Sequence, residues 1–360
     1  MDSIYYYEEL FSKIYNDLKQ KNLIDLLEEI ENPLSYVLMK MEFEGIKLDS
    51  DLLKETKEIF EFEINKLETK IYNISETEFN IASPKQLGEV LFEKLVLESN
   101  PKKTKTGQYS TSEDTLSKLA KKHEIIRLIL EWRSLQKLLT TYVYSLPKQI
   151  HPKSNKIHTE FNQTLTTTGR LSSTNPNLQN IPVRTDRGKL IRKSFIPKDK
   201  NYTLLCADYS QVELRIIAFL SGDSNMKNAF INNEDIHRST AARVFNVNID
   251  DVNEEQRRNA KIVNFGIIYG VSAFGLSNQT DLTRSESKEI INNYFKSYPK
   301  LKEYMSDQIS FARDNGYVET ILKRKRYLPE INSRNAILRS SAERNAINTP
   351  VQGLSLIHIS

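Results

Sequence analysis

The sequence predicts a predominantly helical α+β protein, and three observations carry this prediction. Five apolar residues within residues 51–74 recur at helical spacings of 7, 4, 3 and 4, which indicates a long helix packed on another helix. Residues 113–144 predict a second long helix. Residues 202–207 (YTLLCA) form a short apolar run between polar residues, which predicts a buried strand. The stripe of the first helix consists of Leu53, Phe60, Ile64, Leu67 and Ile71.

Length and composition restrict the class of protein. The 360 residues allow two or three packed units, because one core rarely grows past roughly 250–300 residues. No apolar run approaches the ~18–20 residues of a membrane-spanning helix, and the acidic, tyrosine-rich start does not resemble a signal peptide. The single cysteine, Cys206, excludes an intramolecular disulfide and a thiolate zinc cluster. We expect a cytoplasmic monomer that does not enter a membrane.

The charges are distributed unevenly along the chain. Residues 1–100 hold 22 acidic and 11 basic residues, a net charge of −11, whereas the remaining 25 acidic and 40 basic residues give +15 for residues 101–360. This division suggests that the larger part of the chain faces a polyanion such as a nucleic acid. An ordinary solvated surface is an equally good interpretation of charge alone.

The first half of the chain predicts helices joined by one basic loop. Residues 1–32 predict one or two amphipathic acidic helices that end at Asn32-Pro33. Ser83 and Pro84 predict the cap and first residue of another helix. Residues 99–112 form a lysine-bearing loop, which together with the two long helices predicts a projecting arm. The loop could grip a phosphate backbone, or it could be a solvated loop. The inward positions of the second long helix are Leu116, Leu119, Trp132, Leu135 and Leu139.

The second half begins with residues 158–192, which are rich in Thr, Ser, Asn, Pro and Gly and predict an irregular segment. After the predicted strand, residues 211–220 predict a helix that stops at Ser221-Gly222. Helical stretches and short loops then alternate up to about residue 345.

Asp208 follows the predicted strand. A carboxylate at the rim of a buried sheet needs a cation or a donor to compensate its charge, and Mg²⁺ would supply this. The alternative is that Asp208 only caps the following helix.

Residues 253–270 predict the most informative helix. Asn253 and Gln256 can form a capping box, and Gly270 can end the helix. Four residues on it follow one another at intervals of four, two cations and then two aromatics. Such a stripe can hold a triphosphate and stack a base or sugar. The alternative is that the aromatics belong to the core and the cations pair with acids. The stripe consists of Arg257, Lys261, Phe265 and Tyr269.

These residues resemble a known family. Residues 168–173 (TGRLSS), 175–182 (NPNLQNIP), 208–215 (DYSQVELR) and the stripe with its following Gly270 resemble the polymerase module of family A DNA polymerases, the bacterial DNA polymerase I type, in order and spacing. The resemblance implies a right-hand architecture with an antiparallel palm sheet, helical fingers and a helical thumb. It also implies template-directed addition of deoxynucleotides to a primer 3′ end with release of pyrophosphate, in DNA replication and repair.

The resemblance also implies a division of the chain. The expected parts are a remnant of a 3′–5′ exonuclease-like domain at 1–32, the thumb with the start of the palm at 33–160, the palm at 161–223, the fingers at 224–338, a return to the palm at 339–353 and a non-matching tail at 354–360. The N-terminal part lacks the acidic motifs of that domain, so we expect no exonuclease activity.

Individual roles are implied at matching positions. Asp208 and the Tyr209 carbonyl match the ligands of two Mg²⁺ ions. Lys261 also matches a general acid toward pyrophosphate. Glu213 matches the residue that excludes a ribose 2′-OH. The residues matching the nucleotide site are Arg257, Lys261, Phe265, Tyr269, His237, Gln211 and Glu213. Those matching contacts with primer–template DNA are Arg170, Gln179, Arg344, Asn348 and Gln352.

The resemblance stops at Gly353, where the family continues toward a His-Asp-Glu motif that carries the second metal-binding aspartate. The last acidic residue here is Glu343. We therefore expect a chain truncated before this motif, with weak metal binding and little or no polymerisation alone. Two alternatives stay open: a catalytically dead DNA-binding fragment, and an enzyme like the single-subunit RNA polymerases, against which Glu213 argues.

Overall fold

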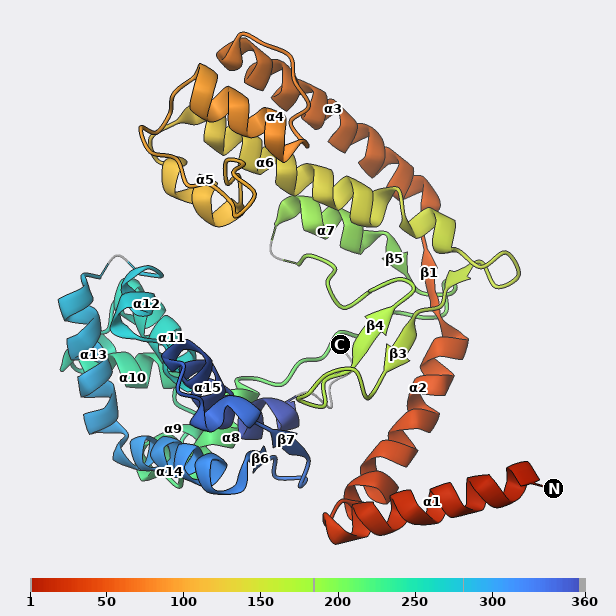
Figure 1. Ribbon diagram of the computed structural model, residues 1–360, viewed down its shortest axis with the longest axis vertical. Coiled ribbons are helices and arrows are strands. Elements are labelled where there is room, and N and C mark those ends of the chain that lie inside the picture. The colour runs from red at the N-terminus through yellow and green to blue at the C-terminus, as the bar shows by residue number, and fades with distance from the viewer. Residues whose placement is uncertain (1, 184, 281, 356–360) are drawn as a thin grey trace. The chain divides into compact units, whose positions relative to one another are not determined.

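The computed structural model describes residues 2–183, 185–280 and 282–355 (Figure 1). The chain divides into two compact units. The first unit comprises Met1–Met39, Phe161–Ser172 and Cys206–Ser360, and the second unit comprises Lys40–Glu160 and Ser173–Leu205. Helices dominate both units, and the strands form small antiparallel sheets, which confirms the predicted predominantly helical α+β class.

The core of the second unit lies between α3 (Ser50–Ser75) and α6 (Glu124–Leu138), which run side by side. All five residues of the predicted stripe on α3 are buried, so the helical spacing identified its inward face correctly. Asp49 caps this helix by accepting a hydrogen bond from the Leu52 N–H. Burial of the stripe therefore holds the two helices together.

The second predicted long helix is interrupted. It divides into α5 (Glu113–Leu119), α6 and the π-helical turn η3 (Leu139–Val143), with a break at residues 120–123. An uninterrupted helix would carry His123 on the same face as Leu116 and Leu119. The break instead lets Ile125 and Ile126 enter the core. The five predicted inward residues are nevertheless all buried.

The remaining helices of the second unit begin at recognisable caps. Ser83 accepts a hydrogen bond from the Gln86 N–H and Pro84 is the first residue of α4 (Pro84–Glu89), as predicted. The segments η2 (Val90–Lys94) and η4 (Leu146–Gln149) complete the helical part. The basic loop at residues 99–112 contains a single antiparallel bridge between Lys103 and Tyr109.

A three-stranded antiparallel sheet orders β2 (Lys156–Ile157), β1 (Ile46–Leu48) and β5 (Phe195–Ile196). β3 (Glu160–Asn162) and β4 (Ser172–Thr174) lie where the chain passes between the units. The prediction of an irregular segment at 158–192 missed the helix α7 (Asp186–Lys193). Its signal is Thr185, whose hydroxyl accepts a hydrogen bond from the Gly188 N–H and caps the helix.

The N-terminal segment forms two helical stretches, α1 (Asp2–Gln20) and the π-helical η1 (Leu26–Glu31). The predicted end at Asn32-Pro33 is wrong, because the chain continues directly into α2 (Asn32–Glu44). Pro33 therefore lies inside a continuous helical stretch, directly after a π-helical turn in which the Asn32 N–H bonds to the Leu27 carbonyl.

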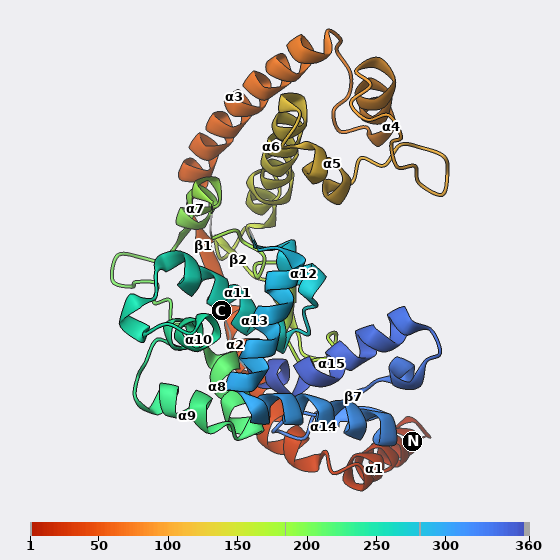
Figure 2. The same ribbon diagram turned by 90° about the vertical axis from the view of Figure 1, so that its left-hand side faces the viewer.

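The first unit otherwise consists of helices and one hairpin, packed around a core to which α8, α11, α13 and α14 all contribute. Helix α14 contacts α8, α15 and the hairpin (Figure 2). The elements in chain order are α8 (Val212–Ser221), α9 (Ser224–Ile231), α10 (Ile236–Phe245), η5 (Ile249–Asp251), α11 (Glu254–Ile268), α12 (Ala273–Ser277), α13 (Arg284–Ser297), α14 (Pro299–Asn315), β6 (Tyr317–Glu319), β7 (Lys325–Tyr327), η6 (Pro329–Asn332) and α15 (Ala336–Ser355).

The prediction of a buried strand at residues 202–207 is wrong. These residues adopt no regular structure and are exposed, and Leu205 retains 89% of its accessible surface. A strand needs a neighbour that pairs with its backbone, and no strand in the described ranges pairs with this segment. By contrast, the predicted end of α8 at Ser221-Gly222 is confirmed, since Gly222 adopts a φ of +70°.

The predicted tail at 354–360 falls mostly on residues 356–360, which lie outside the described residues. Within the part of the chain that is described, no helix has both the length and the apolar character needed to cross a bilayer.

Phe60 and Phe62 on α3 offer a matched test of the second unit's core. Phe60 is fully buried, whereas Phe62 is 71% exposed. We expect Phe60→Ala to lower the free energy of unfolding by about 3–5 kcal/mol, because it leaves a cavity. Phe62→Ala should change it by less than about 0.5 kcal/mol. Urea unfolding followed by circular dichroism measures both, and equal effects would contradict the assigned face of α3.

Candidate active site

Helix α11 is held at both ends by the signals that its sequence predicts. The Asn253 side chain accepts from the Gln256 N–H at 2.8 Å, and Gln256 accepts from the Asn253 N–H at 3.1 Å, so the capping box is confirmed. Gly270 follows the helix with a φ of +69°, a conformation that favours glycine. A Cβ at Gly270 would also lie 2.8 Å from Cγ of Arg344. The helix and its stripe therefore have a defined start and end.

The two cations of the stripe have different surroundings. The Arg257 guanidinium is half-buried and forms an ion pair with Asp235, with an Nη2–Oδ2 distance of 2.8 Å. Lys261 is exposed and has no ion pair with any acid in the described residues. The alternative in which the cations pair with acids thus holds for Arg257 alone. Lys261 is available to an anionic ligand.

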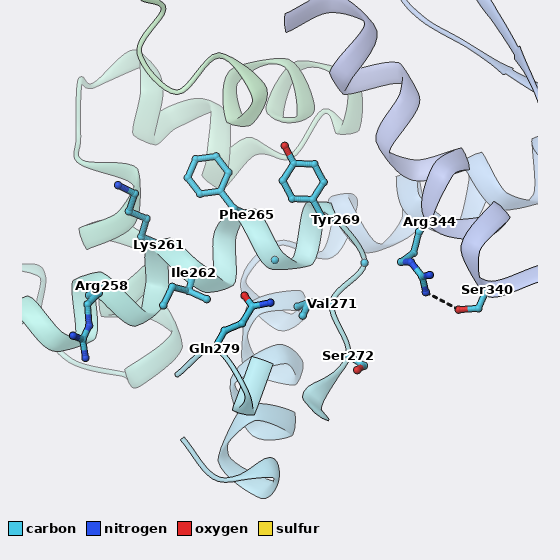
Figure 3. Close-up of a pocket in the computed structure, with 12 residues that line it drawn as sticks. Arg258, Lys261, Ile262, Phe265, Tyr269, Val271, Ser272, Gln279, Ser340 and Arg344 are labelled. Atoms are coloured by element: carbon cyan, nitrogen blue, oxygen red, sulfur yellow. Dashed lines mark hydrogen bonds between the residues drawn. The ribbon is translucent and has the colours of Figure 1, made fainter. Parts of the chain in front are cut away.

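Phe265 and Tyr269 are half-buried and lie along one wall of an open cavity of about 660 Å³ (Figure 3). Lys261 and Arg258 line the cavity on the same helix, and Arg344 reaches it from α15. The cavity combines aromatic faces with cationic side chains, a composition suited to a phosphorylated ligand with a planar ring. The lining residues are Arg258, Lys261, Ile262, Phe265, Gly266, Tyr269, Gly270, Val271, Ser272, Gln279, Ser340 and Arg344.

Tyr269 connects α11 to α8. Its hydroxyl donates a hydrogen bond to Oε2 of Glu213 at 2.5 Å, and Nη2 of Arg170 lies 4.0 Å from Oε1 of the same carboxylate. Burial raises the pKa of Tyr269 to about 12, and the hydrogen bond to Glu213 acts in the same direction. The phenol therefore stays protonated and holds Glu213 in a fixed orientation beside the cavity.

Arg170 is presented by a tight loop. Gly169 has a φ of +82°, and a Cβ there would lie 2.3 Å from Nε of Arg324. The Thr166 hydroxyl donates to the Arg170 carbonyl at 2.6 Å. The conformation of this loop therefore favours glycine at position 169, because of the positive φ and the nearby Arg324 side chain.

His237 is the second residue of α10. Asp235 caps that helix by accepting from the N–H groups of His237 and Arg238. The imidazole is only 4% exposed and its Nδ1 is 3.0 Å from Nδ2 of Asn264. Burial lowers the pKa of His237 to about 4, and the charges of Arg257 and Lys261 add to this effect, while Asp235 opposes it.

The predicted metal ligands do not have the expected surroundings. Asp208 and Tyr209 are exposed in irregular chain, so Asp208 does not lie at the rim of a buried sheet. Asp208 does not cap α8 either, because the N-cap position of that helix is occupied by Gln211, which has a φ of +54°. No three His, Cys, Asp or Glu side chains within the described ranges are arranged to hold a metal ion. The assignment of Asp208 and Tyr209 to a Mg²⁺ site therefore stays a prediction.

The residues matched to DNA contacts are distributed over both units. Arg344, Asn348 and Gln352 follow one another at intervals of four on α15. Arg344 donates to the Ser340 hydroxyl at 3.0 Å, and Oδ1 of Asn348 is buried without a hydrogen-bond partner in the described structure. Gln179 is exposed and belongs to the second unit, whereas Arg170 belongs to the first unit.

Two residues of the site were not anticipated. Asp235 was detectable as a capping residue before α10, but its pairing with Arg257 depends on tertiary packing. Asn264 precedes Phe265 and is fully buried, so nothing in the periodicity distinguished it from a core residue.

The fold and the sequence together place this chain in the class of template-dependent nucleotidyltransferases. The chain belongs to DNA polymerase family A, whose sequence profile matches residues 50–356. It is 49% identical over 346 residues to DNA polymerase I of Bacillus subtilis, covering 96% of this chain and 39% of that protein. It is 52% identical over 351 residues to DNA polymerase I of Caldicellulosiruptor bescii, covering 96% and 41%.

A solved structure is similar over most of the chain. The POL domain of Pol1 from M. smegmatis, in complex with DNA primer-template and dNTP, matches with a TM-score of 0.85 and 40% identity. The match covers 94% of this chain and 59% of that chain. The predicted family and polymerase fold are thus confirmed, while the chain spans about two fifths of the length of the curated relatives.

His237 gives the site a defined pH dependence. Its folded-state pKa of about 4 lies below the ordinary value of 6.5, so the unfolded chain takes up this proton first. We expect its contribution to stability to be full above pH 6.5 and to fall by roughly 3 kcal/mol as the pH drops to about 4. Urea unfolding of wild type and His237→Gln across this range measures the difference. Exposed His151→Gln is the control, and identical pH profiles for all three would contradict the assignment.

Proposed function

We propose that this chain carries out the nucleotide- and DNA-handling steps of template-directed DNA synthesis, in which a deoxynucleotide is added to a primer 3′ end and pyrophosphate is released. The observation that carries the proposal is the α11 stripe, which places an available cation and two aromatic rings along one cavity beside Glu213. Membership of DNA polymerase family A supports it.

In this proposal the triphosphate of the incoming nucleotide lies at the cationic end of α11. Lys261 is exposed and lines the cavity, so it can bind phosphate oxygens and protonate the leaving pyrophosphate. Arg257 is held by Asp235 and would add charge from a fixed position. His237 and Gln211 complete the proposed set of nucleotide-binding residues.

The sugar and base of the nucleotide lie at the aromatic end. Phe265 and Tyr269 offer half-buried faces. Glu213, which is held by Tyr269, would occupy the space that a ribose 2′-OH needs. A steric and electrostatic clash is required for this selection, because favourable contacts alone reject an added hydroxyl poorly.

The proposal assigns primer–template DNA to Arg170, Gln179, Arg344, Asn348 and Gln352. Polar side chains in the minor groove find acceptors at every base pair, so they test duplex shape without reading sequence. The division into thumb, palm and fingers given by the sequence is part of the same proposal.

Metal binding distinguishes two candidate functions of this polypeptide. Family A polymerisation is expected to use divalent metal ions, and Asp208 would supply one carboxylate. The described residues contain no group of three or more His, Cys, Asp or Glu side chains that could hold a metal ion. The exposed position of Asp208 in irregular chain favours a second candidate function for the 360-residue polypeptide, DNA and nucleotide binding without catalysis.

The experiment that tests the proposal compares two proteins on a primed template. We expect the 360-residue chain to bind primer–template, with affinity that falls steeply as salt rises, but to extend the primer little or not at all. A hybrid that continues after Gly353 with the B. subtilis DNA polymerase I sequence should extend it. Gel-based primer extension and fluorescence anisotropy measure both. If the 360-residue chain and the hybrid extended the primer at equal rates, carboxylates beyond those of the 360-residue chain would not be required. Binding that did not depend on salt would contradict the proposed electrostatic contacts with DNA.

Glu213 can be tested in the active hybrid. Glu213→Ala should reduce discrimination against ribonucleotides by at least about tenfold, because the clash with the 2′-OH is lost. Glu213→Gln keeps the volume and serves as the matched control, so most discrimination should remain. Ratios of kcat/KM for dNTP and rNTP provide the measurement, and unchanged selectivity in Glu213→Ala would exclude this role. A preference for rNTP in the unsubstituted hybrid would favour an RNA polymerase instead.

A further inference from the structure

Behind the proposed nucleotide site, a chain of buried polar side chains connects three helices. It begins at Tyr298, which follows α13, and passes through Thr240 on α10 to Asn264 on α11, where it meets His237. Tyr298, Thr240 and Asn264 have no exposed surface, and His237 keeps only 4%. Since a buried polar group without a partner costs about 1–3 kcal/mol, each member of this chain depends on its neighbours.

The contacts define one direction of hydrogen bonding. Oγ1 of Thr240 donates to Oδ1 of Asn264 at 3.1 Å, and this hydroxyl then accepts from the Tyr298 hydroxyl, also at 3.1 Å. The amide nitrogen of Asn264 therefore faces His237, with Nδ2 at 3.0 Å from Nδ1. An amide nitrogen can only donate, so Nδ1 of His237 must accept. The ring proton of the neutral imidazole is then on Nε2.

This assignment matters for a phosphate ligand. The His237 ring lies next to the ring of Phe265, with 5.8 Å between the ring centroids. Phe265 is on α11, the helix that also carries Lys261. An Nε2–H group donates to a phosphate oxygen, whereas an unprotonated Nε2 would present a lone pair and repel it. The orientation of one buried amide thus decides whether His237 attracts or repels an anion.

We propose that Asn264 is a positioning residue that fixes the Nε2–H tautomer of His237, so that the nucleotide site has a neutral donor for a phosphate group. The inference rests on the proposed function for the identity of the ligand. The tautomer itself rests on the buried contacts alone, and it can be measured without any ligand.

The first measurement is the tautomer of His237 in the 360-residue chain. Two-bond ¹H–¹⁵N correlation spectra at neutral pH distinguish Nε2–H from Nδ1–H, and His237→Gln identifies the signals among those of five histidines. We expect Nε2–H in the wild-type protein. Finding the proton on Nδ1 would overturn the proposal, because Asn264 would then accept from the ring through its oxygen.

A substitution then tests whether Asn264 causes this state. Asn264→Asp keeps the shape but replaces the donor by an acceptor, so His237 should carry a proton on Nδ1. Asn345→Asp is the control, because Asn345 lies on α15 outside the buried chain, and the His237 signals should not change in it. A His237 that keeps the wild-type pattern in Asn264→Asp would also overturn the proposal.

The last measurement connects the tautomer to binding of dGTP. We expect Asn264→Asp to weaken dGTP binding about tenfold, and to have little further effect in a His237→Gln background, because Asn264 acts through His237. Fully additive effects would show that Asn264 has only a structural role. Absence of dGTP binding by the wild-type chain, with the Nε2–H tautomer present, would contradict the proposed function and leave the tautomer assignment standing.

Discussion

The ion pair between Arg257 and Asp235 joins the beginning of α10 to α11 and sets the geometry of the candidate site. Asp235 serves two purposes at once, since it caps α10 and neutralises a half-buried guanidinium. The cationic stripe therefore contains one charge that is already compensated and one, on Lys261, that faces an open cavity. Such a division lets the helix remain stable when the cavity is empty while keeping an attraction for an anion.

The buried polar chain behind α11 adds a second constraint of a different kind. Hydrogen bonds between Tyr298, Thr240, Asn264 and His237 prescribe orientation, whereas apolar contacts of the same core prescribe only proximity. At the C-terminal end of α11, Tyr269 orients Glu213 by its hydroxyl. Helix α11 is therefore fixed by directional contacts at two positions, Asn264 within it and Tyr269 at its end, and its functional side chains have few alternative arrangements.

The sequence predicted local features well where one physical signal dominates. The stripe of α3, the caps at Ser83 and Asn253, and the glycine ends of α8 and α11 all have the predicted form. Such features depend on neighbours within one helix. The family was likewise recognisable, because several long motifs occur in order.

Predictions failed where structure depends on distant partners. The run at 202–207 has the composition of a strand, but composition cannot supply a neighbouring strand. The break at residues 120–123 follows from which side chains the core admits, and the partners of Arg257 and His237 come from elsewhere in the chain. The roles of the individual site residues stay predictions until they are measured.

The exposed segment at residues 202–207 affects how the purified protein should be stored. It combines the apolar side chains of Leu204 and Leu205 with Cys206, the single thiol of the chain, and all three are open to water. Exposed apolar side chains promote association between molecules as the protein concentration rises, and thiols brought close together in this way can form intermolecular disulfides in air. Storage would therefore call for dilute samples and a reductant.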